Sequence, residues 1–90
     1  MKGNNMNIHK NAKATAAYAA AETAAVMADF ALDMLASAHR TGMDTMSIAY
    51  ESLRFNVIAR INDAAEAFDN VGKPEAHDAY LARYNDIISA

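Results

Sequence analysis

Few residues of this 90-residue chain could do chemistry, and their spacing does not bring them into a site. The imidazoles belong to His9, His39 and His77, and no Glu-x-x-His or His-x-x-x-His pair offers two metal ligands on one helix face. The chain has no cysteine, which excludes a thiolate zinc site and a thiol nucleophile. Its three glycines are too far apart to form a phosphate-binding loop. We therefore expect no enzyme activity, no metal and no cofactor.

A pair of carboxylates comes closest to a cation site. Asp29 and Asp33 are four residues apart, so a helix would place them on one face. Hard divalent cations take about six oxygen ligands, and two carboxylates supply too few. Together with Glu22, these residues are expected to form a solvated acidic face without a bound metal.

Two arginines, Arg54 and Arg60, could bind a phosphate or a carboxylate, because a guanidinium group donates paired hydrogen bonds to either anion. The chain contains eleven Asp and Glu residues, so ordinary ion pairs explain these arginines better. His39 and Arg40 fit the last turn of a helix, where positive charge complements the helix dipole.

Helices must position these side chains, because a 3.6-residue hydrophobic period dominates the chain and no segment alternates for long like a strand. Breaks occur around Gly42 and between residues 70 and 74. The pattern predicts three helices, over residues 11–39, 45–69 and 74–89. Two long helices joined by a short turn should pack antiparallel. The predicted fold class is therefore all-α: an antiparallel bundle of two long helices plus a shorter third helix.

The ends of these helices carry recognisable signals. Gly42 is expected to adopt the left-handed conformation just after the first helix. Asp44 or Thr45 is the predicted N-cap of the second helix. Pro74 is suited to the first turn of the third helix.

Each predicted helix has one apolar face. On the first helix the face is almost entirely alanine: Ala17, Ala21, Ala24, Ala28, Ala31, Leu35 and Ala38. On the second helix it consists of larger side chains: Met46, Tyr50, Leu53, Val57, Ile61, Ala64 and Phe68. On the third helix it comprises Ala76, Tyr80, Tyr84, Ile87 and Ile88. A small-residue face allows a neighbouring helix to approach closely, so these faces are expected to form the core.

The second helix is also apolar on its opposite side. Ile48, Phe55 and Ala59 project there beside Ser52, and Glu51 and Arg54 supply a polar rim: the predicted interface residues are Ile48, Glu51, Ser52, Arg54, Phe55 and Ala59. A helix that is apolar on two sides is buried on two sides. Three explanations are open: the third helix covers this second side, the side is an interface with a partner protein or with a second copy in a homodimer, or its apolar residues are isolated surface residues without a role.

Charge is distributed unevenly along the chain, whose net charge is -3. Residues 1–13 contain three lysines and no acid, and all eleven acidic residues follow. We expect residues 1–10 to be a flexible basic N-terminal arm and residues 11–90 to be a single domain. Direct nucleic-acid binding is not expected, because the folded part lacks a basic face.

The stretch from Ala14 to Ala38 looks apolar, but three acidic residues interrupt it, which argues against a membrane span. A signal peptide that begins at Lys10 and Lys13 is the competing interpretation, and Glu22 lies in the middle of its would-be apolar region. We expect a cytoplasmic protein.

These observations favour a small non-catalytic interaction module. An acidic protein without a reaction centre fits an adaptor or an inhibitor, for example a phage or mobile-element protein that blocks a host protein with a basic surface. The alternative is an oligomeric protein that binds a small ligand or a nucleotide. Its anion pocket would be lined by Arg54, Arg60 and tyrosines from facing subunits.

Overall fold

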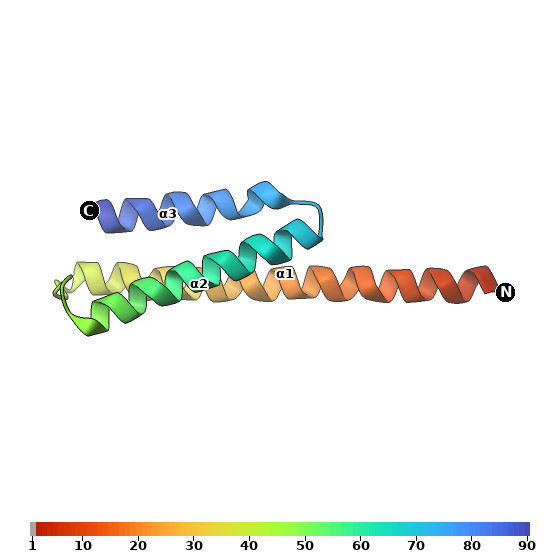
Figure 1. The fold of residues 1–90 in the computed structure, drawn as a ribbon, viewed down its shortest axis with the longest axis horizontal. Helices are drawn as coiled ribbons and strands as arrows, with labels where there is room; N and C mark the ends of the chain where they lie inside the picture. Colours follow the sequence, from red (N-terminus) through yellow and green to blue (C-terminus); the bar gives the residue numbers. More distant parts are fainter. Residues whose placement is uncertain (1) are drawn as a thin grey trace.

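The computed structural model describes the backbone of residues 2–90 and the side chains of residues 12–90. The helices are α1 (Lys2–Arg40), α2 (Ile48–Asn70), the short 3₁₀ helix η1 (Pro74–His77) and α3 (Asp78–Ser89). No strand occurs within residues 2–90. Figure 1 shows α1 and α2 running antiparallel, with α3 returning in the direction of α1. The predicted all-α bundle of two long helices and a shorter third is confirmed.

The first helix is longer than predicted, since α1 begins at Lys2 and not near Asn11. The predicted flexible arm, residues 1–10, lies outside the residues whose side chains the structure describes, and it stays a prediction.

Two glycines end the long helices in the same way. Gly42 and Gly72 both have a φ of +75°, a conformation that costs glycine little. After α1, the N–H of Met43 donates to the carbonyl of Ala38 at 3.0 Å. After α2, the N–H of Lys73 donates to the carbonyl of Phe68 at 2.9 Å. Each is the long bond of a Schellman motif, so the predicted left-handed conformation of Gly42 is confirmed.

The start of α2 was wrongly predicted at Asp44 or Thr45. The N-cap is Ser47, whose Oγ accepts a hydrogen bond from the N–H of Tyr50 at 3.1 Å. Asp44 instead accepts from the N–H of Met46 at 2.9 Å and thereby closes a turn before the helix. Both residues satisfy local N–H groups, but only Ser47 stands where the helix begins.

The third helix also begins later than predicted. Pro74 opens η1, and the α-helix proper starts at Asp78.

The core lies between α1 and α2, where the predicted faces meet. Side chains exposed by less than a tenth are Ala21, Ala28, Ala31, Leu32, Leu35, Ala38, Tyr50, Val57, Ile61 and Ala64. Met46 was wrongly assigned to this face, since it precedes α2 and is 89% exposed. On α3, Tyr80, Tyr84 and Ile87 pack partly buried against this core.

Besides packing on the core, α3 makes an aromatic contact with the end of α2. Phe68, near the end of α2, stacks on Tyr80 with ring centroids 6.4 Å apart. Burial raises the pKa of the Tyr80 phenol, and the negative charge of Asp29 raises that pKa further, whereas Arg83 lowers it. Figure 1 shows that α3 and the first part of α2 diverge.

Candidate interaction surface

The side of α2 that points away from α1 carries exposed hydrophobic residues. Ile48 is 83% exposed and Phe55 is 55% exposed. Ser52 and Ala59 are exposed on the same side. These four residues form what we call the α2 outer face. Large apolar side chains are seldom this exposed in a group, and such groups mark interaction sites more often than chance.

The third helix does not cover the α2 outer face. Among the described residues, α3 contacts the core through Tyr80, Tyr84 and Ile87, and it leaves Ile48 and Phe55 exposed. Of the three explanations that the sequence left open, burial under the third helix is therefore wrong.

The polar rim of this face is centred on Arg54. Its guanidinium carbon lies 5.6 Å from the centroid of the Phe55 ring, within the range of a cation–π contact. The Arg54 Nε is buried and donates to no acceptor among the described residues. Arg54 and Glu51 also line a shallow groove of about 270 Å³ at the beginning of α2, together with Tyr50 and Ser47. One cation and one carboxylate are thus placed beside the exposed aromatic ring.

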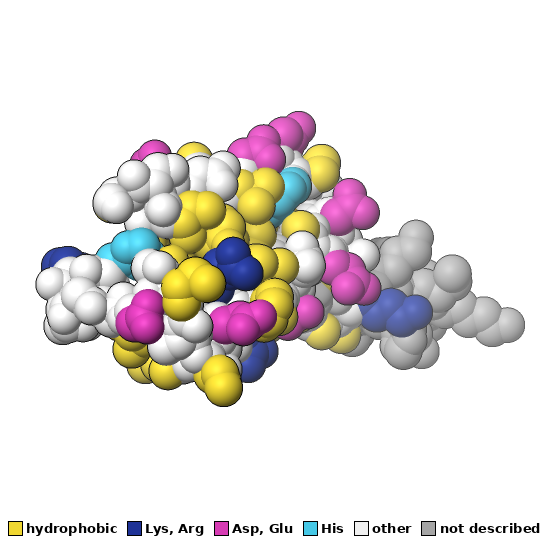
Figure 2. All heavy atoms as spheres, turned by 60° about the vertical axis from the view of Figure 1, so that its left-hand side comes forward, with side chains coloured by type: hydrophobic (Ala, Val, Ile, Leu, Met, Phe, Trp, Pro, Cys, Tyr) yellow, Lys and Arg dark blue, Asp and Glu magenta, His cyan; other side chains and the backbone are white. Residues whose placement is uncertain are grey.

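Figure 2 shows hydrophobic side chains exposed on the face of the molecule in view, some of them next to a Lys or Arg side chain. Ile58, one turn beyond Arg54, is 38% exposed and adds to the apolar surface of α2. The sequence analysis did not select Ile58. Its position three residues after Phe55 was the available signal, because residues three apart are neighbours on a helix.

The two arginines of the predicted anion pocket do not meet within one chain. Arg54 lines the groove at the start of α2, whereas Arg60 lines a separate groove between α1 and α2. Arg60 pairs instead with Asp63, with its Nη1 3.8 Å from the carboxylate.

The acidic face is only partly solvated as predicted. Glu22 is exposed, but Asp29 and Asp33 both bind Arg83 of α3. The Nη1 of Arg83 lies 3.2 Å from the Asp29 carboxylate, and its Nη2 bonds the Asp33 carboxylate. The role of Arg83 was missed by the sequence analysis, although it is the only Lys or Arg within α3. The i, i+4 carboxylate pair therefore attaches α3 to α1.

We expect Arg83→Gln to weaken the attachment of α3 in a salt-dependent way. Exposed ion pairs contribute about 0.2–1 kcal/mol each, so losing two should lower the free energy of unfolding by about 0.5–2 kcal/mol at low salt. Screening should shrink this difference at high salt. Urea unfolding at two salt concentrations measures it. Arg60→Gln, which removes a pair within α2 alone, is the control and should change stability less. Equal losses at both salt concentrations would contradict the assignment.

His39 and Arg40 lie in the last turn of α1, as predicted, and His39 also contacts α2. Its Nε2 lies 2.6 Å from the Tyr50 hydroxyl, and the two rings meet edge to face with centroids 5.2 Å apart. This pair joins the last turn of α1 to the first turn of α2. His77 lies near Pro74 and Asp78 at the start of α3, far along the chain from His39.

Within the described residues, no three His, Asp or Glu side chains converge on a point where a metal could bind. None of the described helices combines the length and the hydropathy needed to cross a membrane.

No protein family, curated protein or solved structure matches this chain. Any functional conclusion therefore rests on the surfaces of the chain itself, and the α2 outer face is the most exposed apolar surface on α2.

Proposed function

We propose that this protein is a small non-catalytic interaction module that binds a partner protein through the α2 outer face. The supporting observation is the exposure of Ile48 and Phe55 on one side of α2, which α3 leaves uncovered. Burying a Phe or Ile side chain contributes about 1.5–3 kcal/mol. Aromatic anchors near the centre of an interface commonly dominate its affinity. Phe55 is the anchor that this proposal assigns.

The charge of the protein indicates the kind of partner. All eleven acidic residues follow the lysine-rich first 13 residues, so the body of the protein is strongly acidic. A complementary partner would present an apolar pocket for Phe55 inside a basic surface, since opposite potentials accelerate association and exclude other partners. An adaptor or an inhibitor acts by occupying such a surface. One example is a protein, encoded by a phage or mobile element, that inhibits a host protein.

We expect Phe55→Asp to abolish the partner complex while leaving the fold intact, because the side chain is more than half exposed. The measurement is affinity capture from the lysate of the native host, compared between wild type and variant by quantitative mass spectrometry. Circular dichroism of both proteins checks that the helix content is unchanged.

Ala82→Asp is the matched control, since Ala82 is exposed on α3 and the substitution adds the same charge. A protein that is captured by wild type and Ala82→Asp but not by Phe55→Asp supports the proposal. Equal capture by all three proteins would show that the α2 outer face is not the docking surface.

A further inference from the structure

A second exposed apolar surface lies on α1, on the side away from the core. Val26 is 65% exposed and Phe30 is 67% exposed, with Met27 and Met34 at 41% and 43%. We call these four residues the α1 outer face. It is separate from the α2 outer face. The helices α1 and α2 pack against each other through their core faces, and each outer face lies on the far side of its own helix.

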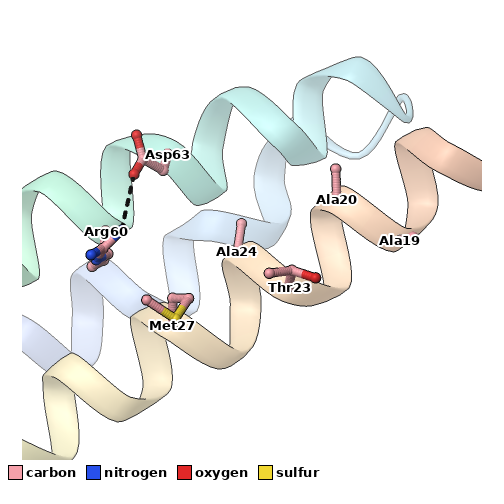
Figure 3. A pocket seen from close by; sticks show the side chains of 7 residues that line it. All are labelled: Ala19, Ala20, Thr23, Ala24, Met27, Arg60 and Asp63. Carbon is pink, nitrogen blue, oxygen red and sulfur yellow. Dashed lines mark ion pairs between the residues drawn. The ribbon is translucent and has the colours of Figure 1, made fainter.

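A groove lies directly beside this face, between α1 and α2. Its walls are mostly small side chains, and its rim carries one ion pair (Figure 3): the lining residues are Ala19, Ala20, Thr23, Ala24, Met27, Arg60 and Asp63. The groove has a volume of about 410 Å³. Because its lining along α1 is mostly alanine, a large side chain from outside can enter without displacing another.

The exposed phenylalanine and the groove are on one helix at a spacing that suits two-fold pairing. Phe30 is seven residues from Thr23, which is about 10.5 Å along a helix. If two α1 helices pack antiparallel with the two-fold axis near Val26 and Met27, Phe30 of each copy is level with Thr23 of the other. Each copy then places its phenylalanine in the other's groove, as a self-complementary two-fold interface requires.

We propose that the α1 outer face binds a second copy of this chain, with Phe30 of each copy seated in the groove of its partner. The proposal is independent of the proposed function, since it assigns self-association to α1 and leaves the α2 outer face of both copies available.

The exposed area of the chain is consistent with such an interface. The four large apolar side chains of the α1 outer face are each between 41% and 67% exposed. Removing such apolar surface from water favours association roughly in proportion to the area buried.

The charges at the edges of the α1 outer face do not oppose this pairing. In an antiparallel two-fold pair, each flank of a helix faces the same flank of the other copy. One flank carries Asp29 and Asp33, which Arg83 partly neutralises. The opposite flank carries Arg60 and Asp63, one charge of each sign, so it can pair with itself. The four residues of the face itself are uncharged.

Sedimentation equilibrium of the full chain tests the proposal. Wild type should be a dimer, and Phe30→Asp should raise the dimer dissociation constant by at least about a hundredfold, because two buried rings are lost per dimer. Ala20→Leu should do the same by filling the groove, and Ala20 is exposed, so the monomer should still fold. Ala82→Leu on α3 adds the same side chain elsewhere and should leave the dimer intact.

Phe55→Asp separates this proposal from the proposed function. It should remain a dimer although it loses the partner, whereas Phe30→Asp should lose the dimer. The proposal is overturned if wild type is a monomer at the highest soluble concentration. It is also overturned if Phe55→Asp dissociates the dimer and Phe30→Asp does not.

Cross-linking provides a second test, because the chain has no cysteine of its own. Val26→Cys lies near the proposed axis and should form a covalent dimer with a short bis-maleimide. Ile48→Cys, on the α2 outer face, should not. The opposite result would place the second copy on α2.

Discussion

Replacing Leu32 with alanine is expected to lower the free energy of unfolding by about 2–5 kcal/mol. Leu32 is fully buried, and among the other large side chains of residues 12–90 only Leu35 and Val57 are as completely enclosed. The neighbouring core positions of α1 are mostly alanine, which has no flexible side chain to move into the space. The cavity should therefore stay open, and its cost adds to the lost burial of the leucine.

Urea unfolding followed by circular dichroism measures this loss, with Leu81→Ala as the control. Leu81 makes the same chemical change on α3 but is 41% exposed, so its truncation should cost less than about 1 kcal/mol. A typical domain has only about 5–15 kcal/mol of stability, so Leu32→Ala should be visibly less folded at elevated temperature. Similar losses from the two variants would mean that Leu32 is not enclosed as the structure has it.

Leu32 also shows where prediction from the sequence was incomplete. Most of the alanine face of α1 is buried as predicted, because a single 3.6-residue period runs through it, but Ala17 and Ala24 are only partly buried. That period defines one narrow seam, and Leu32 lies beside it. In the folded protein α2 packs on one flank of the seam and α3 on the other, so the buried arc of α1 is wider than one partner helix requires. The sequence alone did not specify where α3 would lie.

The position of α3, which the sequence did not specify, also explains why the exposed surface was only partly predicted. Ile48 and Phe55 were recognised as unusual, yet whether α3 covered them depended on the turn from Gly72 to Pro74 and on the contact of Arg83. That contact joins residues more than 50 positions apart, Asp29 and Arg83. No local pattern predicts a pair that depends on how two helices cross. Local signals did predict the left-handed Gly42 at the end of α1, because a left-handed residue is a local requirement.

The second large effect is expected from Ala28→Leu. Ala28 is fully buried on the face of α1 that meets α2, and the core is closely packed around it. A leucine there has no space, so either α1 and α2 separate or the new side chain adopts a strained rotamer. Overpacking of this kind costs typically about 1–3 kcal/mol. The loss arises from added volume, whereas Leu32→Ala destabilises by removing it.

Ala24→Leu should cost less than Ala28→Leu, although both alanines belong to the predicted stripe. Ala24 is only partly buried and lines the groove between α1 and α2, where extra methyl groups can be accommodated. Ala82→Leu, at an exposed position of α3, sets the baseline for the change in helix propensity, since leucine and alanine are both good helix formers. The midpoint of urea unfolding should therefore fall most for Ala28→Leu, less for Ala24→Leu and least for Ala82→Leu. If Ala28→Leu were as stable as Ala82→Leu, α1 would not present its alanine face to α2, and the close packing of these two helices would be wrong.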